Sequence, residues 1–283
     1  RIGFWVDLEH PYITMDNSYI ESVWWSIKQM WDKGLVYQGY KVTPHCPRCG
    51  TSLSSHEVAL GYQEDTEDPS VYIKFKVVNN NIGVIKLDKP AYFLAWTTTP
   101  WTLPGNTALA VSPDAEYSLV EIDNEYLILA DGLREAVGLG DNRVVETIKG
   151  NQLVNAEYEP LFNPHNNGVD RLRPQSHLDS EVTRMTSIFE AQVAAKDLTY
   201  KIIAGDFVSM EDGTGMVHIA PAFGEVDFEA GMHHGLDFVQ PVDLQGKMTG
   251  TYPFAGKFVK IADKDILADL KTRNLLFRSE TIK

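Results

Sequence analysis

The sequence predicts a mixed α/β protein that is mainly β, with a β-barrel-like domain, peripheral helices and a small cysteine knuckle. Short apolar segments, some alternating with polar residues, fill the middle of the chain and are typical of strands. Turn residues separate these segments, which favours a closed or nearly closed barrel. Apolar residues at helical spacing lie only at the margins of this region.

The first predicted element is an amphipathic helix. Ser18 and Glu21 have the spacing of a capping box, and Gly34 supplies a stop. A ligand platform is one interpretation of its apolar face, but a stripe with this period is more often core or a docking surface. The face consists of Ile20, Val23, Trp24, Ile27, Met30 and Trp31.

A cysteine pair and a turn-rich stretch follow the helix. Cys46 and Cys49 stand in Cys-Pro-Arg-Cys between Pro44 and Gly50, which predicts a tight knuckle. The stretch over 63–69 is acidic and has the composition of a linker. We therefore expect a connecting segment over 1–68, a barrel domain over 69–262 and a returning helical segment over 263–283.

Strand patterns begin directly after this boundary. Alternation starts at Val71, and the pair Asp123-Asn124 predicts a hairpin turn. The predicted strands cover 71–77, 92–96, 107–111, 117–122, 125–129, 202–208 and 215–220, and short helices are predicted over 133–137, 225–233 and 263–274.

Composition excludes several classes of function. The net charge of -14 over 283 residues argues against broad, nonspecific nucleic-acid binding, so any RNA contact must be local. No apolar run approaches the length of a membrane span, and the first ten residues are unlike a signal peptide, which favours a soluble cytoplasmic protein without a membrane partner. Because the chain opens at Arg1, we expect a fragment of a longer protein.

The chain has only two cysteines, Cys46 and Cys49. Without secretory signals, such a pair is more often a metal or redox site than a structural disulfide. The pair suits half of a tetrahedral zinc site, which needs four ligands. His45 and His56 are untested candidates for the others.

The densest polar cluster is the segment 96–106, which places four threonine hydroxyls and an asparagine amide between a predicted strand and two prolines. An ordinary strand end with a proline stop explains it equally well. The prolines stiffen the segment, however, and can hold hydroxyls and backbone N–H groups in one geometry, as sites that orient water or bind an oxyanion require. The segment is therefore a candidate pocket wall.

A second cluster, the segment 213–228, places His218 and Asp227 nine positions apart across a turn containing proline and glycine. A lone histidine in an apolar strand is more often a hydrogen-bonded core residue, and Asp227 has a position suited to capping the next helix. The sequence has no Gly-x-Ser-x-Gly elbow, no His-Glu-x-x-His motif and no glycine-rich phosphate loop before a helix.

Taken together, the blocks 97–106 and 213–227 closely resemble the two editing-site signatures of isoleucyl-tRNA synthetases. Leucyl and valyl relatives typically carry Arg-Pro-Glu after their paired threonines, whereas this chain continues from Thr99 to Thr102 as Thr-Pro-Trp-Thr. The resemblance extends over most of the first 110 residues, and little of it covers 140–200. Ala222 and Phe223 replace the Gly-His of many bacterial members, a form more like the eukaryotic-type branch.

This resemblance implies a tRNA-editing module of a parent synthetase. Its implied activity is hydrolysis of valine mischarged on isoleucine tRNA, with valyl-adenylate as a further substrate. The signatures of ATP-dependent activation are absent, so no amino-acid activation is expected. In the family the cysteine knuckle often pairs with another just past the editing module, which leaves Cys46 and Cys49 as a half site for zinc; editing itself needs no cofactor.

Roles for the site residues follow from that activity. Trp101 and His218 are expected to form the wall of a pocket too small for isoleucine, and Asp227 to bind the substrate ammonium. An aminoacyl ester needs no covalent nucleophile, so a placed water and oxyanion donors are expected to suffice. The residues expected to provide them are Thr97, Thr98, Thr99, Thr102 and Asn106.

Two other hypotheses remain open. A noncatalytic tRNA-docking or zinc-ribbon module would use the aromatic helix and the cysteine knuckle without the threonine block. The editing domain of a related valyl or leucyl enzyme would correct threonine or another small amino acid. The sequence does not decide between them, nor whether the isolated module turns over.

Overall fold

The protein is described by a computed structural model that covers residues 5, 7, 9–36, 41–61, 66–82, 85–174, 189–191 and 198–282. The chain divides into two compact units, one of residues 1–40 with 175–188 and one of residues 41–174 with 189–283. Part of the predicted linker, residues 63–65, lies outside the described residues. The predicted boundary near residue 68 stays a prediction.

Helix α1 (Asn17–Asp32) is the described element of the first unit, and it confirms the predicted helix. None of its residues is buried, and the exposed fraction of Trp24 is 65%. Gly34 has a φ of 71° just past the helix end, which is the left-handed conformation that a glycine stop supplies. The predicted capping box is wrong, because the helix already begins at Asn17 and its N-cap is Asp16, which places Ser18 inside the first turn.

The second unit begins with the hairpin of β1 (His45–Cys46) and β2 (Thr51–Ser52). Helix α2 (Ser55–Leu60) follows it, with a capping box between Ser54 and Glu57. This hairpin holds both cysteines in and beside its turn.

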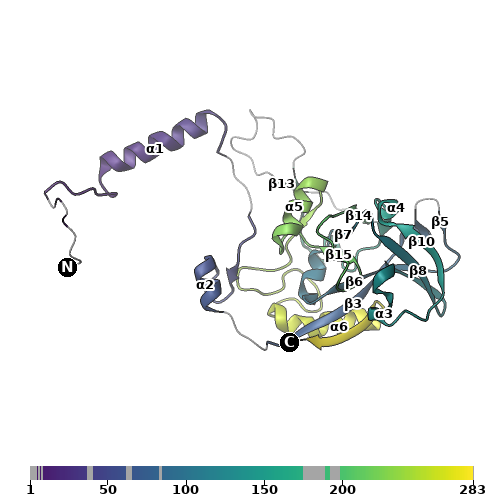
Figure 1. Cartoon of the computed structure of the whole chain (residues 1–283). Coiled ribbons are helices and arrows are strands. Elements are labelled where there is room, and N and C mark those ends of the chain that lie inside the picture. Colours follow the sequence, from purple (N-terminus) through teal and green to yellow (C-terminus); the bar gives the residue numbers. More distant parts are fainter. Residues whose placement is uncertain are drawn as a thin grey trace. The chain divides into compact units, whose positions relative to one another are not determined.

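A ten-stranded mixed sheet forms most of the second unit and curls into a half-barrel (Figure 1). The strand order is β10-β8-β9-β6-β15-β7-β14-β11. Strand β3 pairs with the edge of β6 that faces away from β9 and β15, and β17 pairs with β3. The strands are β3 (Asp68–Lys76), β6 (Ala91–Thr97), β7 (Ala108–Val111), β8 (Glu116–Ile122), β9 (Glu125–Ala130), β10 (Val144–Lys149), β11 (Glu157–Tyr158), β14 (Tyr200–Ala204), β15 (Met216–Ile219) and β17 (Leu276–Ile282).

Smaller elements surround this sheet. A two-stranded hairpin pairs β4 with β5, and a three-stranded sheet has the order β13-β12-β16. The strands are β4 (Asn81–Ile82), β5 (Ile85–Lys86), β12 (Arg171–Pro174), β13 (Phe189–Ala191) and β16 (Phe238–Val239), and the helices are η1 (Val78–Asn80), η2 (Pro100–Gly105), η3 (Asp131–Leu133), α3 (Arg134–Val137), α4 (Gly150–Leu153), η4 (His165–Asn167), α5 (Glu225–His234) and α6 (Val259–Thr272). Among the helices so described, none has the length and hydropathy that a membrane crossing requires.

Both faces of the ten-stranded sheet bury apolar side chains. The main core contains Val71, Ile73 and Phe75 of β3, and α6 closes it with Ile266 and Leu270. A second cluster on the other face includes Tyr72 and Leu94 with Val137 of α3, and a third includes Ile219 with Ala230 of α5. Helices α3, α5 and α6 therefore cover the sheet at three separate places.

The predicted hairpin around Asp123 is confirmed, since β8 and β9 pair across it and Asp123 has a φ of 49°. The segment 263–283 differs from the prediction, because α6 ends at Thr272 and residues 276–282 form strand β17. Asn274, with a φ of 57°, turns the chain after the helix. Residues 276–282 then pair with the edge of β3, and this tertiary pairing stabilises a strand where a helical segment was predicted.

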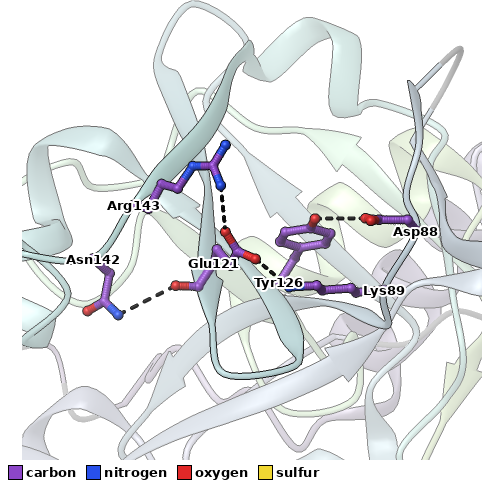
Figure 2. Close-up of polar contacts among 6 residues, drawn as sticks. All are labelled: Asp88, Lys89, Glu121, Tyr126, Asn142 and Arg143. Atoms are coloured by element: carbon purple, nitrogen blue, oxygen red, sulfur yellow. Dashed lines mark hydrogen bonds and ion pairs between the residues drawn. The ribbon is translucent and has the colours of Figure 1, made fainter.

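A polar cluster fixes the loop before β6 to the tip of the β8–β9 hairpin (Figure 2). Glu121 of β8 accepts hydrogen bonds from the Lys89 ammonium and from Arg143 Nη1, the latter at 3.3 Å. Tyr126 of β9 donates its hydroxyl to Asp88 Oδ1 at 2.8 Å. Because β6 starts at Ala91, these contacts set where the central strand enters the sheet.

Substitution of a glycine that has no room for a side chain would test how closely the second unit is packed. A Cβ on Gly150, the first residue of α4, would stand 2.0 Å from the Ser112 carbonyl oxygen. We expect Gly150→Ala to lower the free energy of unfolding by about 1–3 kcal/mol, because backbone must move to relieve the clash. Urea unfolding of this chain measures the change.

The matched control is Gly132→Ala, because a Cβ there meets nothing within 4 Å. Its free energy of unfolding should change by no more than about 0.5 kcal/mol. Equal effects of the two substitutions would contradict the packing around Gly150.

Candidate functional site

Parallel pairing brings the two polar blocks together. Strands β6 and β15 run parallel, with Trp96 opposite Val217. The carboxyl ends of parallel neighbours lie at the same edge of a sheet, so the residues after β6 and those at the end of β15 meet there. Thr97 ends β6 and His218 is the third residue of β15.

Three of the four threonine hydroxyls of the first block form a connected chain. Thr97 Oγ1 accepts the Thr99 backbone N–H at 3.1 Å and lies 3.3 Å from Thr99 Oγ1. Thr99 Oγ1 lies 3.4 Å from Thr102 Oγ1, and the Thr102 hydroxyl donates to the Thr99 carbonyl at 2.8 Å. Within the described residues, no hydrogen bond joins the half-buried Thr98 hydroxyl to this chain.

His218 extends the threonine chain across the sheet. Its side chain is buried, and its Nε2 lies 3.0 Å from Thr102 Oγ1. Because the Thr102 hydroxyl already donates to Thr99, it accepts from His218, which assigns the hydrogen of the neutral ring to Nε2. Nδ1 is buried without a partner among the described residues, and burial lowers the pKa of His218 to about 4.

Asp227 is tied to the end of the same strand. It lies in the first turn of α5, and its Oδ2 accepts the backbone N–H of Ala220 at 2.9 Å. Burial raises the pKa of this carboxyl, against the lowering effect of that hydrogen bond. None of the ion pairs between described residues includes Asp227.

An aromatic pair connects η2 with the turn after β15. The rings of Trp101 and Phe223 pack edge to face, with centroids 5.0 Å apart. A Cβ on Gly105 would stand 2.7 Å from the Phe223 ring, so the end of η2 also touches it closely. From the sequence Phe223 was only a departure from the family pattern; the structure assigns it a packing role beside Trp101.

Asn106 has a different environment from the threonines. Its Nδ2 donates to the carbonyls of Ala108 at 2.8 Å and Ile219 at 3.4 Å, and its Oδ1 accepts the Tyr158 hydroxyl at 2.7 Å. Both ends of the buried amide are thus occupied by the protein. These contacts favour a positioning role for Asn106, and Tyr158 is a supporting residue that no sequence signal revealed.

Cys46 and Cys49 are neighbours in the β1–β2 hairpin. The backbone N–H of Cys49 is the main cause that lowers the pKa of the Cys46 thiol, and the thiol pair interacts directly. His45 directs its Nε2 to the Leu244 carbonyl at 2.7 Å. The described residues contain no group of three His, Cys, Asp or Glu side chains that fits a metal ion.

Sequence comparison places these features among the aminoacyl-tRNA synthetases. The family model described as tRNA synthetases class I (I, L, M and V) matches residues 1–232. The isoleucine–tRNA ligase of Dehalococcoides mccartyi strain 195 is 53% identical over 288 residues, covering 99% of this chain and 27% of the relative. That of Thermus thermophilus is 43% identical, covering 99% and 24%. The chain spans about a quarter of the length of these curated relatives.

Solved structures give the fold. The crystal structure of GlLeuRS-CP1 matches with a TM-score of 0.51 and 16% identity, covering 76% of this chain and 99% of that chain. The editing domain of the P. falciparum cytosolic leucyl-tRNA synthetase matches with a TM-score of 0.50 and 12% identity, covering 74% and 98%. The mainly β architecture is therefore similar to that of synthetase editing domains.

The hydrogen-bond direction at His218 generates a test by NMR. We expect its imidazole to stay neutral as pH is lowered from 8 to about 5, to titrate near 4, and to carry its hydrogen on Nε2, because burial disfavours the cation and Thr102 accepts from that nitrogen. Nitrogen chemical shifts of the ring measure both properties. His218→Gln identifies the resonance by removing it.

The same group affects stability in a defined direction. Since the folded pKa of His218 lies below the unfolded value of 6.5, the unfolded chain binds more protons between about pH 6.5 and pH 4, and this residue's contribution to stability is lost as pH falls through that window. Titration near 6.5, or a hydrogen on Nδ1, would contradict this description of the site.

Proposed function

Because the chain belongs to the class I tRNA synthetase family, we propose that it is the editing module of an isoleucine–tRNA ligase and hydrolyses valine mischarged on isoleucine tRNA. Valyl-adenylate is a second substrate under this proposal. The observation that carries it is the hydrogen-bonded wall in which Thr97, Thr99 and Thr102 join His218 at the shared edge of β6 and β15. Its relatives at 40–53% identity support the isoleucine class.

Selection in this site is by size. Isoleucyl-tRNA synthetase is itself the standard example of double-sieve editing, in which one methylene gives the synthetic site only about 1–3 kcal/mol of discrimination. A second pocket that excludes isoleucine corrects the error. Trp101, held by Phe223, and His218, held by Thr102, are the side chains proposed to narrow this pocket, since packing fixes both.

Asp227 is proposed to bind the ammonium of the valine moiety. Its carboxyl is half-buried, accepts the Ala220 N–H and lacks a cation within the described structure. Burial disfavours its charged form, as the raised pKa records. A substrate ammonium would reverse that effect and form a charge-assisted hydrogen bond.

Hydrolysis is proposed to use water held by the threonine block. The ester is attacked directly, without a covalent intermediate, and hydroxyl and backbone N–H groups stabilise the developing oxyanion. Thr98 is the strongest candidate to contact substrate or water, because its hydroxyl lies outside the Thr97–Thr99–Thr102 chain. His218 is neutral near pH 7, so it positions Thr102 by donating to it and does not supply a positive charge.

The remaining parts of the proposal concern partners. The proposed RNA contact is limited to the aminoacylated 3′ end of tRNA, because the net charge of -14 opposes broad binding of RNA. The rest of the parent synthetase, a cytoplasmic location and zinc at Cys46 and Cys49 are also proposed; two further ligands would have to join the cysteines. The editing chemistry uses no cofactor.

The decisive experiment measures deacylation of isoleucine tRNA carrying valine, threonine or isoleucine. We expect this chain to release valine and to spare isoleucine. Asp227→Asn should reduce kcat/KM for the valine substrate by about 10- to 100-fold, because it removes the negative charge proposed to bind the substrate ammonium without changing the side chain's shape.

Glu225→Gln is the matched control, since Glu225 is an exposed carboxylate in the same first turn of α5. It should leave kcat/KM unchanged. Normal deacylation by Asp227→Asn would refute the role of Asp227. Preferred release of threonine would indicate a related editing specificity, and tRNA binding without any hydrolysis would indicate a docking module that uses the exposed aromatic face of α1.

A further inference from the structure

Asn106 links the end of the threonine block to the end of β15. It is the C-cap residue of η2, and its backbone N–H donates to the Leu103 carbonyl at 3.1 Å. Its side-chain Nδ2 donates to the Ile219 carbonyl at 3.4 Å, and the same carbonyl accepts the Thr107 backbone N–H at 2.9 Å. Ile219 directly follows His218 in β15, so these contacts join the two polar blocks beside the histidine.

The amide of Asn106 can make its contacts in one orientation only. The carbonyl oxygens of Ala108 and Ile219 are acceptors, so the Nδ2 end must face them. The Oδ1 end then needs a donor, and at 4% exposure Asn106 is shielded from bulk water. The Tyr158 hydroxyl is that donor, at 2.7 Å. Without this hydroxyl, Oδ1 would be a buried acceptor with no partner, which favours rotation of the amide or a shift of the segment that carries it.

Tyr158 holds its hydroxyl in a fixed place. Its side chain is fully buried, and its ring packs edge to face on Phe75 of β3, with centroids 5.4 Å apart. Strand β11 pairs with β14, where Tyr158 stands opposite Tyr200, and a β-bridge joins Tyr158 to Val77. Burial raises the pKa of Tyr158 well above its ordinary value, so the phenol stays protonated and able to donate. The donor is therefore anchored by its strand pairing and by its ring contacts.

We infer that Tyr158 is a positioning residue of the candidate site: its hydroxyl holds the Asn106 amide, which in turn ties the end of η2 to β15 beside His218. The inference rests on the proposed function for its catalytic consequence. None of the hydrogen bonds between described residues joins Tyr158 to the threonine block or to His218, so Tyr158 acts through Asn106. Trp101 and Thr102 belong to η2 and would move with it. A displacement of about 1 Å is enough to slow a reaction strongly.

The first test compares Tyr158→Phe with Tyr200→Phe. Each removes one buried hydroxyl from neighbouring rings whose centroids lie 6.1 Å apart, but the Tyr200 hydroxyl has no hydrogen-bond partner within the described structure. In Tyr158→Phe we expect kcat for deacylation of valine-charged isoleucine tRNA to fall about tenfold and KM to change less than about threefold, because Asp227 keeps its own contact. Tyr200→Phe should keep the wild-type kcat and KM.

A double-mutant cycle tests whether Tyr158 acts through Asn106. Asn106→Ala should lower kcat at least as much as Tyr158→Phe, because it removes the contacts at both ends of the amide. The double variant should then be no slower than Asn106→Ala alone, since the Tyr158 hydroxyl has no amide left to hold. Losses of kcat that multiply in the double variant would overturn the inference.

The side-chain amide of Asn106 gives a measurement that does not depend on catalysis. Its hydrogens should exchange with solvent about tenfold faster in Tyr158→Phe, as followed by NMR, and at the wild-type rate in Tyr200→Phe. Wild-type exchange and kcat in Tyr158→Phe, or equal losses of kcat in both phenylalanine variants, would overturn the inference. If the wild type deacylates no substrate, the proposed function fails, while the exchange data still decide the role of Tyr158.

Discussion

The arrangement of the site depends on the pairing of β6. Its residues 92–97 pair with β3 along one edge, while the other edge is shared between β9 at the strand's start and β15 at its end. Only because β15 replaces β9 there, and runs parallel to β6, does His218 reach Thr102, which is 116 residues away in the chain. Antiparallel pairing would have placed the ends of the two strands at opposite edges. The polar cluster around Glu121 and the β3–β17 pair hold β6 on its two sides, so distant parts of the fold serve this one juxtaposition.

The sequence predicted the individual site residues and the local hairpins better than the contacts between segments that are distant in the chain. The threonine block and His218 were identifiable because hydroxyls between prolines, and a histidine in an apolar strand, are unusual residue choices. Their contact was predictable only through the family resemblance. Alternation and turn residues predicted the β8–β9 hairpin, whose pairing is local. By contrast, β17 was hidden because its partner β3 lies far earlier in the chain, with Leu276 opposite Ile73, and the pattern of neighbouring residues carries no information about such pairing.

Supporting residues escaped prediction for a similar physical reason. Tyr158 is one such residue: it belongs to a segment with ordinary composition, and it acquires its role by donating its hydroxyl to the amide oxygen of Asn106. For Asn106, residue type correctly indicated a polar function at the wall, but only the structure supplies partners for both ends of its amide. A buried hydrogen-bonding group must be satisfied, and which segment satisfies it is decided by packing.

The two titratable groups at the wall, His218 and Asp227, share one feature: burial shifts the pKa of each toward the neutral form. For His218 this shift is compatible with the hydrogen bond to Thr102, because the neutral ring still donates from Nε2. For Asp227 it opposes the charge that the proposed role requires, and the backbone N–H of Ala220 offsets it only in part. The two shifts act in opposite senses for the proposed site: burial keeps His218 neutral near pH 7, and it disfavours the carboxylate of Asp227. The same low-polarity surroundings that make these charges unfavourable also strengthen each hydrogen bond they accept, and a substrate ammonium placed there would be held by Asp227 more firmly than in water.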